Sequence, residues 1–91
     1  MEIYNEIEKL VNTIIPFKNT GNLPINEDPV FNINDKWYLM FCRHQNSTIP
    51  VLTTNNIYAV RYSLLNSLNL LNNENILKVK LLLEEYIINK L

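Results

Sequence analysis

The chain has very little glycine and cysteine, and no cluster of positive charge. It contains one Gly and one Cys among 91 residues. Phosphate-cradling loops need several glycines, and a disulfide within the chain or a cysteine zinc site needs more than one cysteine. The sequence therefore contains no sign of a nucleotide-binding loop, a disulfide framework or a cysteine metal site. We expect no cofactor.

Charge is sparse and widely spread. Lys and Arg together number 8, Asp and Glu number 9, and the net charge is −1. A surface that follows a phosphate backbone would have to be assembled from scattered positions. Nucleic-acid binding or transcriptional regulation is therefore an alternative function and not the expected one. Binding of a small anion or a nucleotide is the second alternative.

The sequence also shows no recognisable targeting or membrane segment. Residues 1–6 are acidic and amphipathic, whereas a secretory signal has a basic start followed by an apolar run. No uncharged segment is apolar enough to cross a bilayer. We expect a cytoplasmic protein that does not act at a membrane.

The composition is that of a folded domain with an unusual codon bias. Hydrophobic residues make up 47% of the chain and charged residues 19%, which is typical of globular proteins. We expect one domain over 1–91. Sixteen Asn against a single Ala indicate a low-GC coding sequence, which points to a low-GC bacterium, its phages, or an AT-rich virus or eukaryote.

The most informative segment is 36–44, which holds the only Trp, Cys and His of the chain. Side chains alternate along a strand, so two apolar faces are predicted here. One face would carry Trp37, Leu39 and Phe41, and the other Tyr38, Met40 and Cys42. A strand that is apolar on both faces is covered on both sides, by helices, by a second sheet or by a partner. We expect Trp37, Leu39 and Phe41 to be buried and Cys42 to be unreactive.

The first half of the chain predicts a helix, a loop and a hairpin. Apolar residues recur at the helical period over 2–15, and Pro16 ends that pattern. Residues 16–29 hold the only Gly and three of the four prolines, and we expect a mobile loop there. Segments 30–34 and 36–44 then predict a hairpin.

The predicted turn of this hairpin is Asn34-Asp35. A two-residue turn would pair Phe31 with Tyr38 and place Phe31 on the face of Met40. A third strand is predicted over 48–52, and Pro50 would confine it to an edge of the sheet.

The second half predicts two helices. The first is expected to begin within 53–56 and to bury an apolar stripe. The stripe consists of Ile57, Val60, Leu64, Leu68 and Leu71. The second helix is expected over 74–90, capped by Asn73, with large apolar residues on nearly every side. The predicted fold class is α+β: an N-terminal helix, a small antiparallel hairpin or three-stranded meander, and two C-terminal helices.

The best candidate for surface recognition lies on the first of these two helices. Tyr58, Arg61 and Tyr62 fall at i, i+3 and i+4, so they would form one patch on a helix. Tyr and Arg are favoured at binding hot spots. The alternative is that the tyrosines close the rim of the core, with their hydroxyls in water.

The sequence also contains two residue groups that could form a chemical site. Arg43, His44 and Arg61 could line an anion pocket near a helix start, although two solvated arginines explain the pattern as well. Cys42 and His44 could form a nucleophile pair, but no orienting third group is recognisable and a buried cysteine is usually inert. We expect no enzyme, no catalytic residues and no metal ligands.

The sequence therefore favours a small non-catalytic protein that binds another protein. Inhibitors, immunity proteins and regulators of bacterial or phage origin often have this size, which is an argument by analogy. Tyr58, Arg61, Tyr62, Arg43 and His44 are the predicted partner-binding residues. We also expect a homodimer or a tight complex, with residues 74–91 contributing most of the buried interface, because the last helix carries more apolar surface than its neighbours can cover.

Overall fold

The computed structural model describes residues 2–17, 30–44, 47–54 and 61–90. These residues form eight elements in sequence. They are α1 (Glu2–Ile14), β1 (Val30–Asn32), β2 (Trp37–His44), β3 (Ser47–Thr54), β4 (Arg61–Ser63), α2 (Leu64–Ser67), the 3-10 helix η2 (Leu68–Leu70) and α3 (Asn73–Lys90). The predicted α+β class is confirmed.

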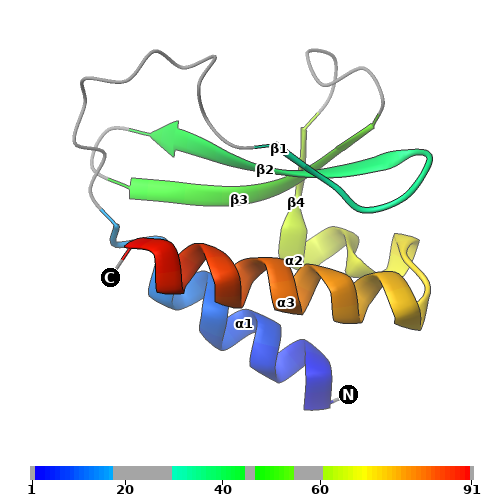
Figure 1. Cartoon of the computed structure of the whole chain (residues 1–91), viewed down its shortest axis with the longest axis horizontal. Coiled ribbons are helices and arrows are strands. Elements are labelled where there is room, and N and C mark those ends of the chain that lie inside the picture. The colour runs from blue at the N-terminus through cyan, green and yellow to red at the C-terminus, as the bar shows by residue number, and fades with distance from the viewer. Residues whose placement is uncertain (1, 18–29, 45–46, 55–60, 91) are drawn as a thin grey trace.

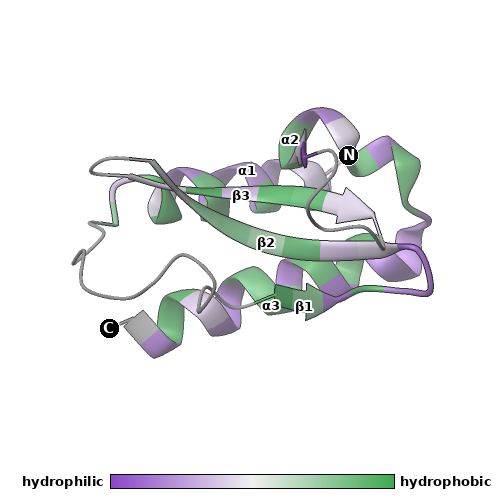
Figure 2. Cartoon of the chain, turned by 90° about the horizontal axis from the view of Figure 1, so that it is seen from above, coloured by the Kyte–Doolittle hydropathy of each residue, from purple (hydrophilic) through white to green (hydrophobic). Residues whose placement is uncertain are grey.

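The molecule has two layers. The four strands form one antiparallel meander in the order β1-β2-β3-β4. All three α-helices lie against the same face of this sheet, with α1 and α3 side by side (Figure 1). Viewed from above, β2 and β3 lie over the helical layer, and α2 and α3 lie toward opposite sides of the molecule (Figure 2). We call the sheet face toward the helices the inner face and the opposite one the outer face.

The core lies between the inner face and the helices. Trp37, Leu39 and Phe41 are buried there, as predicted. The ring of Phe41 stacks on Tyr86 of α3, with 3.8 Å between centroids and 6° between planes. The aromatic side chains thus join the central strand to the last helix. The buried apolar cluster also includes Ile7, Val11, Ile14, Ile33, Leu52, Leu64, Leu68, Leu71, Ile76, Val79 and Leu83.

The predicted register of the first hairpin is wrong. Phe31 pairs with Leu39 and not with Tyr38, so it lies on the inner face, where its ring contacts Phe41 at 5.9 Å between centroids. The connection is longer than the predicted two-residue turn, because Ile33 N–H donates to the Trp37 carbonyl (2.9 Å) across Asn34, Asp35 and Lys36. One added residue moves a whole strand to the other face, because side chains alternate.

The side chain of Asn34 explains this longer connection. Its Oδ1 accepts hydrogen bonds from the backbone N–H groups of Lys36 and Trp37, both at 2.8 Å. Asn favours turns because its side chain can satisfy backbone donors a few residues ahead. The predicted turn residues are thus used, but in a different geometry.

The predicted third strand exists, but β3 is an inner strand of the sheet and not an edge. Thr48 N–H donates to the Ile15 carbonyl (3.1 Å), which lies outside the sheet. Backbone donors alternate in direction along a strand, and Pro50 is two residues after Thr48. A backbone N–H at position 50 would therefore also point away from β2. β4 pairs only with residues 51–53 of β3, so the missing donor of Pro50 costs no hydrogen bond between strands.

The prediction of a helix over 57–71 is wrong for residues 61–63, the first of these residues that the structure describes. Residues 61–63 form β4 and pair with residues 51–53 of β3. The helix begins only at Leu64 and soon tightens into η2. Leu64, Leu68 and Leu71 are nevertheless buried as predicted. Strand pairing therefore overrode the helical pattern here, while residues 55–60 lie outside the described part of the chain.

The first and last helices agree with the predictions. α1 ends at Ile14, two residues before Pro16, and α3 runs over Asn73–Lys90. The cap of α3 is one residue earlier than predicted, because Oδ1 of Asn72 accepts from Asn75 N–H at 2.9 Å. The predicted mobile loop falls mostly on residues 18–29, outside the described residues.

Candidate functional site

The predicted Tyr58–Arg61–Tyr62 patch does not form on a helix. Arg61 and Tyr62 are neighbours on strand β4, so their side chains leave opposite faces of the sheet. Tyr62 lies on the inner face, where its ring meets Trp37 edge-on at 5.6 Å. Tyr58 lies outside the described residues. The exposed rim position of Tyr62 agrees with the alternative that it closes the core.

The arginines of the proposed anion pocket are far apart in the sheet. Arg43 pairs with Thr48 of β3, and Arg61 pairs with Thr53. Five residues of strand separate these positions by roughly 17 Å. The strand positions of the two arginines are therefore not adjacent, as a pocket for one small anion would require. Side-chain positions of Arg43 and His44 lie outside what the structure describes.

The described part of the chain has neither a group of potential metal ligands nor a buried polar side chain without a partner. No three His, Cys, Asp or Glu residues among the described ones lie close enough to hold a metal ion. In the same residues, every buried side-chain nitrogen or oxygen has a hydrogen-bond partner. Cys42 is half-buried on the outer face, opposite Ile49 of β3. The remaining candidates for a functional site are the apolar surfaces.

The outer face of the sheet is the first apolar surface, and it is largely shielded. Val51 and Thr53 are buried there, although no described helix lies over this face (Figure 1). Tyr38, Met40 and Cys42 are half-buried. Of the described apolar residues on this face, only Val30 and Ile49 are more than a third exposed. The helices cover the inner face of β2, as expected, whereas no described helix or second sheet covers its outer face.

The outer side of α3 is the second apolar surface and the more accessible one. Leu77, Leu81 and Ile88 are 47%, 56% and 69% exposed. Their spacing of four and seven residues places them on one side of the helix. Val79 and Leu83 lie on the opposite side, within the core. We call Leu77, Leu81 and Ile88 the α3 stripe.

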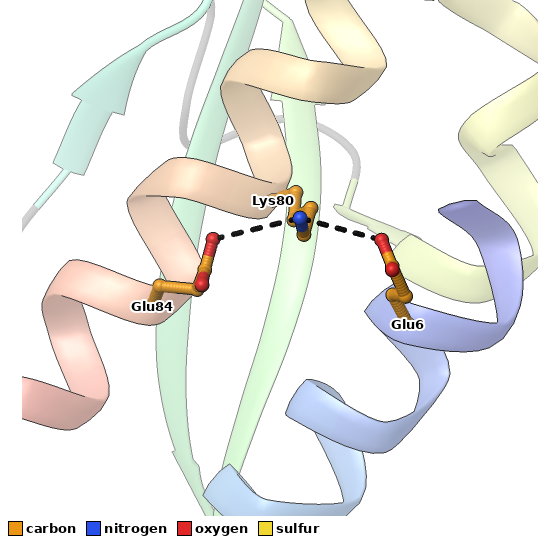
Figure 3. Close-up of polar contacts among 3 residues, drawn as sticks. All are labelled: Glu6, Lys80 and Glu84. Carbon is orange, nitrogen blue, oxygen red and sulfur yellow. Dashed lines mark ion pairs between the residues drawn. The ribbon is translucent and has the colours of Figure 1, made fainter. Parts of the chain in front are cut away.

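One edge of the α3 stripe is occupied by α1. Nζ of Lys80 lies 3.3 Å from Oε2 of Glu6 on α1 and 4.0 Å from Oε1 of Glu84 (Figure 3). Ile87, seven residues after Lys80, is half-buried against the core cluster. These contacts keep the edge that carries Lys80 against its own chain. Such partly exposed ion pairs orient side chains more than they stabilise the fold.

The other edge of the α3 stripe carries Lys78 and Glu85, both exposed. Nζ of Lys78 also donates a hydrogen bond to the Ile33 carbonyl at 3.2 Å. The stripe is therefore bordered by charged residues of both signs. An apolar centre with a polar rim is the usual composition of a protein–protein interface.

No protein-family model, curated protein or solved structure matches the chain. Among the described residues, no helix combines the length and the apolar character needed to cross a membrane. The fold and the surface together define a small α+β domain that presents an apolar helix stripe.

Sequence reasoning identified the excess of apolar residues on the last helix but not the stripe. The periodicity of 74–90 placed large apolar residues on nearly every side. Only the packing of α3 against α1 and the sheet shows which of them remain outside the core. Of the partner-binding residues predicted from the sequence, Arg43 and His44 lie on β2 and Arg61 and Tyr62 on β4.

Proposed function

We propose that this chain is a non-catalytic protein-binding protein, and that the α3 stripe is its contact surface. The observation that supports the proposal is the exposure of Leu77, Leu81 and Ile88 along one side of a well-anchored helix. Single exposed apolar residues are ordinary on protein surfaces. Three in line on one helix side are typical of a helix that packs against a partner.

The anchoring of α3 favours binding with little reorganisation. Ile76, Val79, Leu83 and Tyr86 on its other side are buried, so the stripe is held in place before any partner arrives. A preformed surface loses less conformational entropy on binding than a flexible one. By analogy of size, we place the chain among inhibitory, immunity or regulatory proteins of bacterial or phage origin.

The test is affinity purification from extracts of the native host, followed by measurement of the captured partner in purified form. Leu81→Lys places a charge at the centre of the stripe and should raise the Kd about 10- to 100-fold. Leu65→Lys is the matched control, because Leu65 is also exposed (39%) but lies on α2, away from α3. It should bind like the unmodified chain.

Two results would contradict the proposal. Equal affinity of Leu81→Lys and the unmodified chain would exclude the α3 stripe as the contact surface. Capture of a nucleic acid, with an affinity that falls steeply as the salt concentration rises, would favour the nucleic-acid alternative. An interface centred on aliphatic side chains should respond only weakly to salt.

A further inference from the structure

We propose that the partner of the α3 stripe is a second copy of this chain, with the two α3 helices antiparallel about a two-fold axis. This inference rests on the proposed function, since it names the occupant of the same surface. A self-complementary surface of this kind is what a two-fold homodimer requires. The spacing, the charges and the position of α1 each support it.

The spacing of the stripe is that of a helix–helix seam. Leu77, Leu81, Glu84 and Ile88 follow one another at intervals of four, three and four residues. This alternation of three and four is the heptad pattern by which two helices pack along a common line. Three of the four seam positions are large aliphatic residues with at least 47% exposure.

The charges on the accessible edge favour the antiparallel orientation. Lys78 and Glu85 are seven residues apart, so they occupy equivalent positions on the edge away from α1. In an antiparallel pair, this edge of one helix faces the same edge of the other. Lys78 of each copy then lies beside Glu85 of the other, and the two-fold axis makes this contact twice.

A parallel pair would instead need the edge that α1 occupies. Parallel helices bring opposite edges together, so Lys80 would have to pair with Glu85 of the second copy. Lys80 already lies between Glu6 and Glu84, and its side chain is 26% exposed (Figure 3). The parallel arrangement therefore conflicts with the packing of α3 on α1.

The same charges select one register. Placing Leu77 opposite Ile88 of the second copy brings all three aliphatic residues into the seam and aligns Lys78 with Glu85. A shift of one heptad toward the start of α3 would put Lys78 opposite itself and leave Ile88 outside. Like charges placed opposite one another oppose that register.

Glu84 limits the strength of this dimer. In the favoured register it lies near the two-fold axis, opposite Leu81, so two carboxylates approach each other. Lys80 lies 4.0 Å from Glu84 and offsets part of this repulsion. With so few apolar residues, we expect a weak dimer, with a Kd on the order of micromolar or higher.

The test uses two single charge reversals and their mixture. Lys78→Glu alone and Glu85→Lys alone each place like charges at both edge contacts, and each should raise the dimer Kd at least about tenfold. An equimolar mixture restores opposite charges at both contacts and should dimerise like the unmodified chain. Glu8→Lys is the control, because it reverses an exposed charge on α1.

Masses are measured by light scattering and sedimentation over about a hundredfold range of concentration. We expect the unmodified chain to rise from 10.7 kDa toward twice that mass. Recovery in the mixture also shows that both variants are folded, which matters for Lys78 because of its hydrogen bond to Ile33.

Three outcomes would overturn the inference. They are a monomeric mass of the unmodified chain at every concentration, unchanged dimerisation of both reversals, and failure of the mixture to recover. If the chain stays monomeric while another protein binds it and loses affinity with Leu81→Lys, the inference fails and the proposed function holds. If Leu81→Lys affects neither association, both fail.

Discussion

The two faces of β2 should respond very differently to truncation, and this difference tests the packing of the whole domain. Phe41 and Met40 are neighbours on the strand, but Phe41 is buried on the inner face and Met40 is half-buried on the outer face. We expect Phe41→Ala to destabilise the protein far more than Met40→Ala does.

The magnitude follows from the contacts of each side chain. Phe41 is 1% exposed and contacts the rings of Tyr86 and Phe31. Truncation of a buried Phe costs about 3–5 kcal/mol, including the cavity that it leaves. Met40 loses only part of its burial and leaves no enclosed cavity, so about 1–1.5 kcal/mol is expected. A domain of this size is typically stable by roughly 5–14 kcal/mol, so Phe41→Ala should remove a large part of that stability.

The measurement is urea unfolding followed by the fluorescence of Trp37, the only tryptophan, and by circular dichroism. With a slope of about 1.3 kcal/mol/M, Phe41→Ala should lower the midpoint by roughly 2–4 M and Met40→Ala by about 1 M. Coincident transitions from the two probes would show two-state unfolding.

Equal losses at Phe41 and Met40 would refute the reasoning, because the inner face would then not be the core face of β2. A loss below about 1 kcal/mol for Phe41→Ala would also refute it, since truncation of a buried side chain with these contacts should lower the free energy of unfolding by more than that.

Three further predictions concern the turn, the contact of Phe17 with β3, and the dimer. Asn34→Ala should cost about 1–2 kcal/mol of stability, because it removes the acceptor of two backbone donors. Asn34→Asp keeps an acceptor and should cost less than about 0.5 kcal/mol. Equal losses for the two variants in urea unfolding would contradict the role of Oδ1. Thr48→Val should cost about 1 kcal/mol in the same assay, because the buried Thr48 hydroxyl donates to the Phe17 carbonyl at 3.1 Å; no loss would mean that this bond does not stabilise the fold. Glu84→Leu should tighten the proposed dimer at least about tenfold in sedimentation, and an unchanged Kd would argue against Glu84 in the seam.

The elements with a strong and continuous pattern could be predicted from the sequence. Helical periodicity ended by Pro16 determined α1, and the continuous apolar run of 37–42 determined β2. In both, one local property, the arrangement of the apolar residues, agrees with the final environment. The α+β class follows from the order of these elements.

Two wrong predictions, the hairpin register and the helix over 57–71, share one cause, because each depends on pairing between segments. The turn at Asn34 is one residue longer than expected, and this alone moved Phe31 to the other face. The apolar spacing of 57–71 suits a helix, but residues 61–63 gain hydrogen bonds from β3 as a fourth strand. Local periodicity carries no information about such partners.

The candidate site shows the same division. The sequence alone determined that α3 has apolar residues on nearly every side. Only the tertiary structure decided which of them α1 and the sheet bury, and thus that Leu77, Leu81 and Ile88 face outward. It also separated Arg61 from Tyr62, because neighbours on a strand point to opposite faces. Composition determines how much apolar surface a chain must bury, whereas the contacts between its elements determine where the remainder is exposed.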